Sequence, residues 1–313
     1  MFHPLSTKNP LDLDAAVFLA RASEAAYEED PAVDTWAKAN GFPQGGNSFS
    51  NSHVQGFWAA TGDIAFMALR GTQTVAHWVR NFTVATSKHE WGRVHLGFHD
   101  GVYQVESAIG DFIVAASKAQ YVWITGHSLG GAMAVIAAAR VKMSGIRASV
   151  CTFGQPKMGL SDFAERFAIE LPGRYARFVN QNDVVPRIPP VYIHFGLQKR
   201  IVRPGVLGLL ESVAVAGAVE VHPNLFSAKT ALSVSAFDSA KAIQNSEIDG
   251  PMVIDAELPP LSNQQFLDLQ LALQEEELGP ALEGRFLDLH LPSIQDHRIS
   301  EYIRLLTEIR DAS

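Results

Sequence analysis

A serine in a glycine-rich turn is the residue of this chain whose surroundings most clearly suggest chemistry. Gly126-His127-Ser128-Leu129-Gly130 follows the β-rich run Tyr121–Thr125 and precedes an alanine-rich segment that favours a helix. Such a turn between a strand and a helix holds its serine in a strained conformation, with the hydroxyl at the end of the strand. The pattern predicts that Ser128 is a nucleophile. A serine that only caps the helix is the alternative.

A serine hydroxyl needs a base to take its proton, and a histidine base needs a carboxylate to fix its tautomer. Asp183 lies in a polar turn after an apolar run, and His297 precedes the last helical pattern of the chain. The order serine, aspartate, histidine fits a catalytic triad, so we predict Asp183 as acid and His297 as base. Asp183 as a plain turn residue is the alternative. His222 is the second choice for the base, whereas His194 is expected to support the acid loop and His127 to pack or hydrogen-bond behind the serine.

The elements that must position these residues alternate between strands and helices. Apolar runs predict strands at 53–60, 64–69, 121–125, 148–153 and 175–179. Helical patterns occupy 12–27, 97–118, 128–143, 161–170, 264–278 and 297–310. The first two strands are joined by the turn Thr61-Gly62-Asp63 and should form a hairpin, and Asn40–Ser52 is rich in turn residues. Strands that alternate with helices imply crossover connections and a mainly parallel sheet.

Composition narrows the class of protein further. The 313 residues are 47% hydrophobic and 19% charged, which is typical of a packed globular chain. A net charge of −8 argues against a general nucleic-acid binder, and the single Cys151 excludes an intrachain disulfide framework and a cysteine-based zinc site. Nothing in the sequence demands a metal, nucleotide or other cofactor.

The sequence also predicts that the protein is not an integral membrane protein. The longest apolar stretch, Gly205–Val219, contains Glu211 and would span about 22 Å as a helix, against roughly 30 Å for a bilayer core. The N-terminus has no basic region followed by an apolar core, so no secretory signal peptide is expected. We therefore expect a soluble protein that is cytoplasmic or exported without a recognisable signal peptide.

Several separated motifs resemble, in the same order, those of the fungal-type (class 3) triacylglycerol lipases. They are ALRGT at 68–72, a tryptophan at 78, VHLGF at 94–98, GHSLGGA at 126–132, TFGQPKMG at 152–159, RFVNQNDVVPRIPP at 177–190, YIHFG at 192–196 and DHRISEY at 296–302. The resemblance covers about Phe57–Pro190 and resumes at the C-terminal end. It implies an α/β-hydrolase fold, with a mainly parallel central sheet flanked by helices and a lid helix; an insertion before the catalytic histidine is predicted from the length of the chain there, as given below.

The same resemblance implies roles for individual residues. By position, Ser128 is the nucleophile, Asp183 the acid and His297 the base, and an oxyanion hole is formed by Thr72 and the backbone N–H of Leu129. The chemistry needs such a hole, because a tetrahedral intermediate carries negative charge on the former carbonyl oxygen. The alternative for Thr72 is an ordinary residue at a strand end.

The segment after Thr72 resembles the lid of that family. Four apolar residues repeat at positions i, i+3, i+4 and i+7, an apolar stripe on a short amphipathic helix, namely Val75, Trp78, Val79 and Phe82. As a lid, this helix would swing its apolar face onto a lipid interface and uncover Ser128. A helix docked permanently on the core is the alternative.

The chain departs from the family pattern in three ways. Lys157 stands where arginine is usual and Leu160 where asparagine is common, and the disulfides of secreted fungal members cannot form. The interval of 114 residues between Asp183 and His297 is also long (297 − 183). We therefore predict a single α/β-hydrolase domain, 1–313, with an insertion at about 197–282. For its apolar part, Val206–Val219, the sequence leaves three alternatives: a second flap over the active site, a wall of the acyl-chain site or a buried helix.

The predicted function is hydrolysis of carboxylic esters through an acyl-enzyme, with triacylglycerol or acylglycerol as the default substrate and transient contact with a lipid interface. A phospholipase A1, a galactolipase or a feruloyl-type esterase would use the same triad. A catalytically silent α/β-hydrolase that serves as a binding module is the alternative from a different class.

Overall fold

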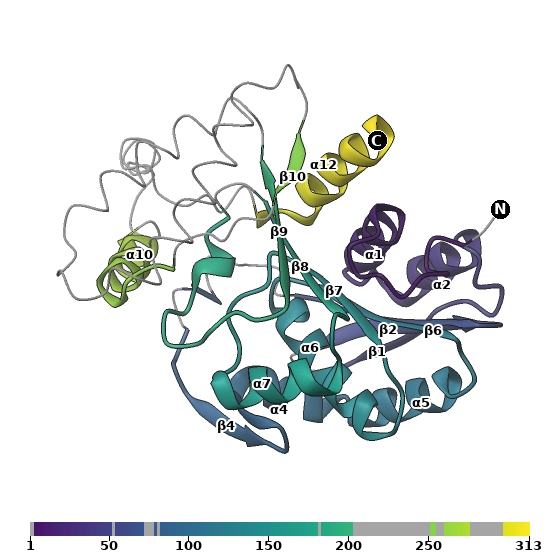
Figure 1. Cartoon of the computed structure of the whole chain (residues 1–313), viewed down its shortest axis with the longest axis horizontal. Coiled ribbons are helices and arrows are strands. Elements are labelled where there is room, and N and C mark those ends of the chain that lie inside the picture. Colours follow the sequence, from purple (N-terminus) through teal and green to yellow (C-terminus); the bar gives the residue numbers. More distant parts are fainter. Residues whose placement is uncertain are drawn as a thin grey trace.

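The chain is built around a mixed sheet with helices on both of its faces (Figure 1). The computed structural model describes residues 3–51, 54–71, 78–79, 82–180, 183–202, 251–254, 260–275 and 297–313. Within these residues the sheet has the strands β1 (Asn47–Ser50), β2 (Gln55–Thr61), β3 (Ile64–Leu69), β6 (Tyr121–His127), β7 (Ser149–Phe153), β8 (Tyr175–Asn180), β9 (Leu197–Val202) and β10 (Met252–Ile254). A separate hairpin is formed by β4 (Thr86–His89) and β5 (Gly92–His95).

The strand order brings the C-terminal ends of the central strands to one edge of the sheet. The sheet runs β1-β2-β3-β6-β7-β8-β9-β10, and the pairs from β3 to β9 are parallel. The hairpin of β2 and β3, the pairing of β1 and the pairing of β10 are antiparallel and lie toward the two sides of the sheet. Because β6, β7 and β8 are parallel neighbours, the loops that follow them meet at one edge of the sheet.

Helices cover the two faces as separate groups (Figure 1). One face carries α1 (Leu13–Ala25), α2 (Asp30–Ala39) and α12 (Ile299–Ala312). The other carries α4 (Leu96–Gln104), α5 (Glu106–Ala116), α6 (Leu129–Met143) and α7 (Ser161–Glu170). The helix α10 (Asn263–Glu275) adds Phe266 and Leu269 to the second of these cores, and a short 3₁₀ helix, η1 (Val185–Arg187), follows Asp183.

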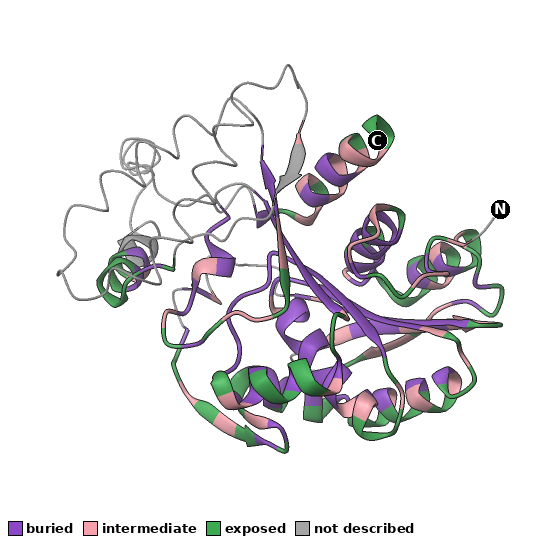
Figure 2. Ribbon diagram, in the orientation of Figure 1, coloured by how far each residue is buried: buried purple, intermediate pink, exposed green. Residues whose placement is uncertain are grey.

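Burial explains why these segments form these elements. Every residue of β7 and β8 is buried, as are six of the seven residues of β6 (Figure 2), which accounts for their nearly continuous apolar sequences. The helix α6 packs on β3, β6 and β7 and also contacts α4 and α5, and eleven of its fifteen residues are buried. Its alanines therefore allow a close approach on all sides. At the start of α1, the Asp12 side chain accepts a hydrogen bond of 2.9 Å from the Ala15 N–H.

The predicted parallel sheet with flanking helices is confirmed, and α7 has the predicted bounds. The predicted helix 97–118 is instead two helices, α4 and α5, which meet at Val105. Asn40–Ser52, expected to be turns, contains the edge strand β1. No helix in the described ranges is long and apolar enough to cross a membrane, and the apolar stretch Gly205–Val219 lies outside those ranges.

The segment predicted as an insertion is partly described. Its first residues form β9, which pairs with β8, and its later residues include β10 and α10. We propose, as the sequence suggests, one domain over 1–313 with added chain at about 197–282.

Candidate active site

Ser128 occupies a strained turn between β6 and α6. Its φ of 58° makes it the one non-glycine residue with positive φ in the described chain. Its N–H donates a hydrogen bond of 3.0 Å to the Phe153 carbonyl at the end of β7. A side chain on Gly130 would place its Cβ 2.0 Å from the Leu69 carbonyl oxygen, and one on Gly126 would lie 2.4 Å from the Gly130 backbone. The two glycines are therefore required by the close approach of the backbone.

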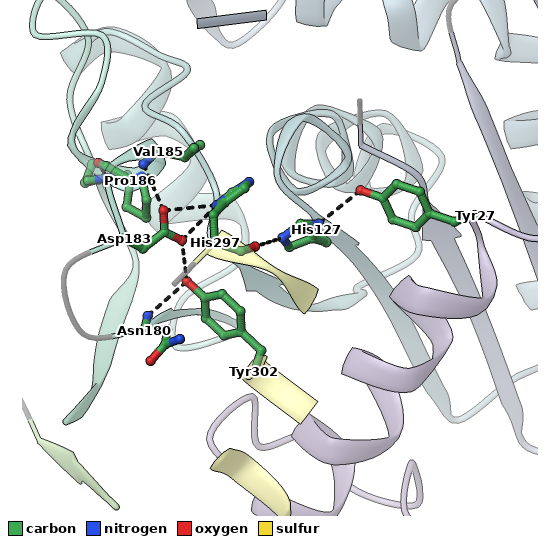
Figure 3. A network of polar contacts seen from close by, with 9 residues as sticks. Tyr27, His127, Asn180, Asp183, Val185, Pro186, His297 and Tyr302 are labelled. Carbon is green, nitrogen blue, oxygen red and sulfur yellow. Dashed lines mark hydrogen bonds and ion pairs between the residues drawn. The ribbon is translucent and has the colours of Figure 1, made fainter. Parts of the chain in front are cut away.

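Asp183 and His297 lie in direct contact although 114 residues separate them (Figure 3). Asp183 follows β8, His297 precedes α12, and both are almost fully buried. The His297 Nδ1 lies 3.0 and 2.8 Å from the two Asp183 carboxylate oxygens. Because a carboxylate only accepts, Nδ1 carries the proton, and Nε2 keeps the lone pair that a general base needs.

Two further donors hold the Asp183 carboxylate in place. Its Oδ1 accepts a hydrogen bond of 2.9 Å from the Val185 N–H, and its Oδ2 accepts one of 2.7 Å from the Tyr302 hydroxyl (Figure 3). The Tyr302 oxygen itself accepts a hydrogen bond of 2.9 Å from the Asn180 N–H. These contacts satisfy a carboxylate that is removed from water and fix the plane in which it meets His297.

Gly154 makes room for this pair. It follows β7 with φ +59°, and a Cβ there would lie 2.8 Å from the Asp183 Oδ2, from the His297 Nδ1 and from the His297 Cε1. The carboxylate and the imidazole therefore lie directly against the backbone at the end of β7, beside the Phe153 carbonyl that binds the Ser128 N–H.

The serine and the histidine lie at the same edge of the sheet and share a buried environment. His127, next to Ser128, packs its ring 4.6 Å from the ring of His297. The Ser128 Oγ and the His297 Nε2 are both buried, and neither has a hydrogen-bond partner among the described residues. Catalytic hydrogen bonds are often long in enzymes without substrate and shorten when the substrate binds. The free lone pair and the free hydroxyl are the groups that a triad uses.

His127 lies behind the serine, as the sequence predicts. Its Nδ1 lies 3.0 Å from the Tyr27 hydroxyl and its Nε2 2.6 Å from the His297 carbonyl oxygen (Figure 3). Burial lowers the pKa of His127 well below its usual range, so the ring is neutral. Burial also raises the pKa of Tyr27 to about 12, which keeps the phenol protonated.

Sequence reasoning does not identify the two tyrosines. Tyr302 lies within the DHRISEY motif, five residues after His297, so the sequence could have identified it as a neighbour of the histidine. Tyr27 lies beyond the end of α1 and reaches His127 across 100 residues of sequence, and no local pattern marks it.

The other predicted residues are only partly described. Thr72 and Val75 lie outside the described residues. Val79 and Phe82 are buried in the same core cluster, against which Trp78 packs. The Phe82 ring stacks on His95 with centroids 4.5 Å apart and meets Trp78 edge-on at 4.9 Å. This burial agrees with the docked helix that was the alternative to a lid.

The structure also describes Leu129 and one of the two remaining candidate histidines. Leu129 is the first residue of α6, so its N–H is one of the helix amides that lack an acceptor within the helix. His194 contacts the Pro186 carbonyl beside the acid loop, and burial lowers its pKa well below the usual range. His222 lies outside the described residues.

A serine in a strained turn after β6, a buried aspartate after β8 and a histidine before the last helix, on a mainly parallel sheet, are the arrangement of the α/β-hydrolase fold. The structure is similar to the crystal structure of a fungal lipase, with a TM-score of 0.57, 19% identity, and coverage of 95% of this chain and 97% of that one. At this identity the similarity supports the fold alone.

Sequence comparison places the chain more narrowly. Residues 66–193 match the family described as lipase (class 3). A secreted mono- and diacylglycerol lipase of Fusarium solani is 33% identical over 131 residues, which are 40% of this chain and 39% of that protein. A lipase of Rhizomucor miehei is 30% identical over 146 residues, which are 42% of this chain and 40% of that protein. Residues 66–193 are therefore similar to the class 3 lipases. The matched segments span about two fifths of the length of these relatives.

Proposed function

We propose that this protein is a serine hydrolase of lipid esters in which Ser128, Asp183 and His297 form the catalytic triad. The observation that carries the proposal is the contact of 2.8 Å between His297 and Asp183, at the sheet edge where Ser128 stands in its strained turn. The contact occupies the His297 Nδ1 and turns the buried Nε2, which has no hydrogen-bond partner among the described residues, into the nitrogen available to act as a base.

The mechanism follows from these positions. The Ser128 Oγ attacks the ester carbonyl carbon while the His297 Nε2 takes its proton, and the Asp183 carboxylate stabilises the imidazolium that forms. The imidazolium then protonates the leaving alkoxide, and the acyl group remains on Ser128. Water, deprotonated by the same Nε2, attacks this acyl-enzyme and releases the carboxylic acid.

The oxyanion of each tetrahedral intermediate needs donors that are already in place. We assign this role to the N–H of Leu129, which is directed by its position at the start of α6, and to Thr72. Gly71 precedes Thr72, and a Cβ on Gly71 would lie 2.9 Å from the Ser128 Cβ. This proximity supports a place for Thr72 beside the nucleophile.

Access to the serine requires a movement. Ser128 has 0% of its surface exposed, so an ester cannot reach it without displacement of the groups that cover it. We propose that the segment with Val75, Trp78, Val79 and Phe82 is the lid that moves. Its described members pack on the core in this closed arrangement.

The relatives with matching segments are mono- and diacylglycerol and other lipases, which supports acylglycerols as the substrate class. A direct experiment measures hydrolysis of p-nitrophenyl esters of graded chain length and of mono-, di- and triacylglycerols. The Ser128→Ala variant should lose at least about 10⁴-fold in kcat on every ester that the native chain hydrolyses. Ser144→Ala, at the exposed opposite end of α6, is the matched control and should retain native rates.

The outcomes separate the candidate functions. Activity that survives in Ser128→Ala would refute the triad, and no hydrolysis of any ester by the native chain would favour a binding module. Faster hydrolysis of phospholipid, galactolipid or feruloyl esters than of acylglycerols would keep the mechanism and change the substrate.

A further inference from the structure

The chain that leads from the proposed lid into β4 is fixed to the core by hydrogen bonds to its carbonyl groups. The Thr83 carbonyl oxygen accepts one of 2.9 Å from the His95 Nε2, since a carbonyl can only accept. The Ala85 carbonyl oxygen accepts one of 2.7 Å from the Leu96 N–H and one of 2.8 Å from the Tyr192 hydroxyl. All three donors lie in the part of the chain that matches the class 3 lipases.

The residues just before this point are held by α10, which lies outside that match and, in Figure 1, on the opposite side of the molecule from α1 and α2. The Gln270 Nε2 lies 3.0 Å from the Val79 carbonyl oxygen and 3.3 Å from the Phe82 carbonyl oxygen, and the two hydrogens of one amide group can serve both. Trp78 and Val79 are helical, and the last carbonyl groups of a helix lack donors within it. Within the segment, the Phe82 N–H reaches the Val79 oxygen only at 3.4 Å. Gln270 therefore caps this helical turn from a separate element.

α10 meets the segment with a single face. Phe266, Leu269 and Gln270 have the spacing i, i+3 and i+4, which places them on one side of a helix. Phe266 and Leu269 are buried in the apolar cluster that also contains Val79 and Phe82. The Phe266 ring meets the Phe82 ring edge-on at 6.3 Å. The helix also begins with its own capping box, so α10 is a formed helix that docks through two apolar side chains and one amide.

The segment held by α10 continues the chain that passes the nucleophile. A Cβ on Gly71 would lie 2.9 Å from the Ser128 Cβ and 2.6 Å from the His127 carbonyl oxygen. Trp78 follows Gly71 by seven residues (78 − 71). A contact that holds Val79 in place therefore also restrains the chain beside a serine that is 0% exposed.

We propose that α10 is an autoinhibitory latch, which holds the proposed lid closed through Gln270 and Phe266. The inference rests on the proposed function, which supplies the lid and the nucleophile. Opening requires the Val79 and Phe82 carbonyl groups to leave Gln270, whereas the hydrogen bonds to Thr83 and Ala85 can persist. The chain should therefore pivot between Phe82 and Thr83. Because α10 lies outside the segment similar to the class 3 lipases, the latch is a regulatory device that this chain adds to that segment.

Substitution of Gln270 by a side chain of the same shape tests the latch. Gln270→Glu presents an ionised carboxylate, which cannot donate, to two carbonyl oxygens at neutral pH. Gln264→Glu is the matched control, because it adds the same charge to the same helix at an exposed position, where the Gln264 Nε2 contacts Asp268 at 2.8 Å. The measurement is the rate constant for modification of Ser128 by a soluble p-nitrophenyl phosphonate, without lipid or detergent. Loss of two hydrogen bonds should raise this rate constant at least about fivefold in Gln270→Glu and leave it within about twofold of native in Gln264→Glu.

A second variant keeps the test independent of the new charge. Gln270→Met removes the donor but adds no charge, and it should raise the phosphonylation rate by a similar factor. Rates on emulsified tributyrin should stay near native in all variants, because lipid opens the lid in each of them. The ratio of the emulsion rate to the rate on p-nitrophenyl acetate in solution should therefore fall about fivefold in both Gln270 variants. Urea denaturation establishes that each variant is folded.

The measurements distinguish failure of the latch from failure of the proposed function. A native chain that is not phosphonylated at Ser128, with or without emulsified lipid, refutes the function itself. Phosphonylation of native Ser128 with equal rates in the two Gln270 variants and in Gln264→Glu overturns the latch and leaves the function standing. A lower rate in both folded Gln270 variants also overturns it, because Gln270 would then support the open arrangement and not the closed one.

Discussion

The imidazole of His127 bridges the hydroxyl of Tyr27 and the backbone carbonyl of His297, at 3.0 and 2.6 Å. Since a carbonyl oxygen only accepts, the His127 Nε2 carries the proton, and its Nδ1 must accept the proton of the Tyr27 hydroxyl. Burial lowers the pKa of His127 well below its usual range, so the ring is neutral and its two hydrogen-bond partners fix this tautomer. A second histidine therefore holds the backbone of the proposed base from behind.

Tyr27→Phe should lower kcat by about tenfold and leave KM nearly unchanged. The substitution leaves the buried His127 Nδ1 without its donor, at a cost of about 1–3 kcal/mol, and frees the ring to change tautomer and release the His297 carbonyl. Rates should be measured per active site, with titration by a p-nitrophenyl phosphonate. Tyr175→Phe is the matched control, because it removes another buried phenol, which donates to Gln155 at 2.5 Å. Equal losses in the two variants would contradict a positioning role for Tyr27.

Tyr302→Phe should weaken catalysis through the acid. The Asp183 Oδ2 would lose a donor at 2.7 Å, and the Asn180 N–H would lose its acceptor at 2.9 Å. We expect kcat/KM to fall by roughly tenfold and the free energy of unfolding by about 1–2 kcal/mol. Asp183→Asn, which removes the charge and the tautomer control, should cost about 10⁴-fold. Stopped assays and urea denaturation of both variants test this ranking, and a Tyr302→Phe loss as large as that of Asp183→Asn would refute it.

Gly154→Ala should disrupt the acid and base more than it disrupts the fold. The new Cβ would lie 2.8 Å from Asp183 Oδ2 and His297 Nδ1, so these two groups must separate. We expect a loss of about 10²-fold in kcat. Gly173→Ala is the control, because Gly173 has a similar φ of +66° but open space around its Cβ position. It should cost about 1 kcal/mol of stability and no activity. If both variants keep native kcat, Gly154 has no special relation to the triad.

The sequence predicts those helices and strands in which the apolar positions of the sequence are also the positions buried in the folded chain. The helix Ser161–Glu170 buries Phe163, Ala164 and Phe167, and this spacing is visible in the sequence. The hairpin β2–β3 likewise follows from two apolar runs separated by a glycine turn. The contact of Asp183 with His297 was predictable only in part, from the order of residue types and from the resemblance to a known family.

Other features depend on contacts that no local pattern encodes. The break between α4 and α5 falls at Val105, within the run Val102–Ile109, which has neither glycine nor proline, so the helical pattern continues through it. The strand β9 contains Gln198, Lys199 and Arg200 in succession, and these polar residues hide its place in the sheet. The Tyr27–His127 hydrogen bond joins residues that meet only after the sheet has formed.

Acid should destabilise the protein through His89, which is 1% exposed at the end of β4. Its Nδ1 accepts a hydrogen bond of 3.0 Å from the Trp91 N–H, and its ring packs edge-on against Phe163. Burial lowers the pKa of His89 from 6.5 to about 4, against a smaller opposing effect of Glu90, while His99 and Arg140 lower it further. Between these two values the unfolded chain binds a proton that the folded chain does not.

The stabilisation from neutral His89 is therefore fully present above pH 6.5 and is lost as the pH falls toward 4. Urea denaturation at pH 7.5 and 5.0 should give a lower free energy of unfolding at the acid pH. His89→Gln should lower stability at pH 7.5 but reduce the difference between the two pH values, because glutamine binds no proton in either state. Part of the difference should remain, since burial also lowers the pKa of His127. A His89→Gln variant with the full native difference would show that His89 is not the group that titrates.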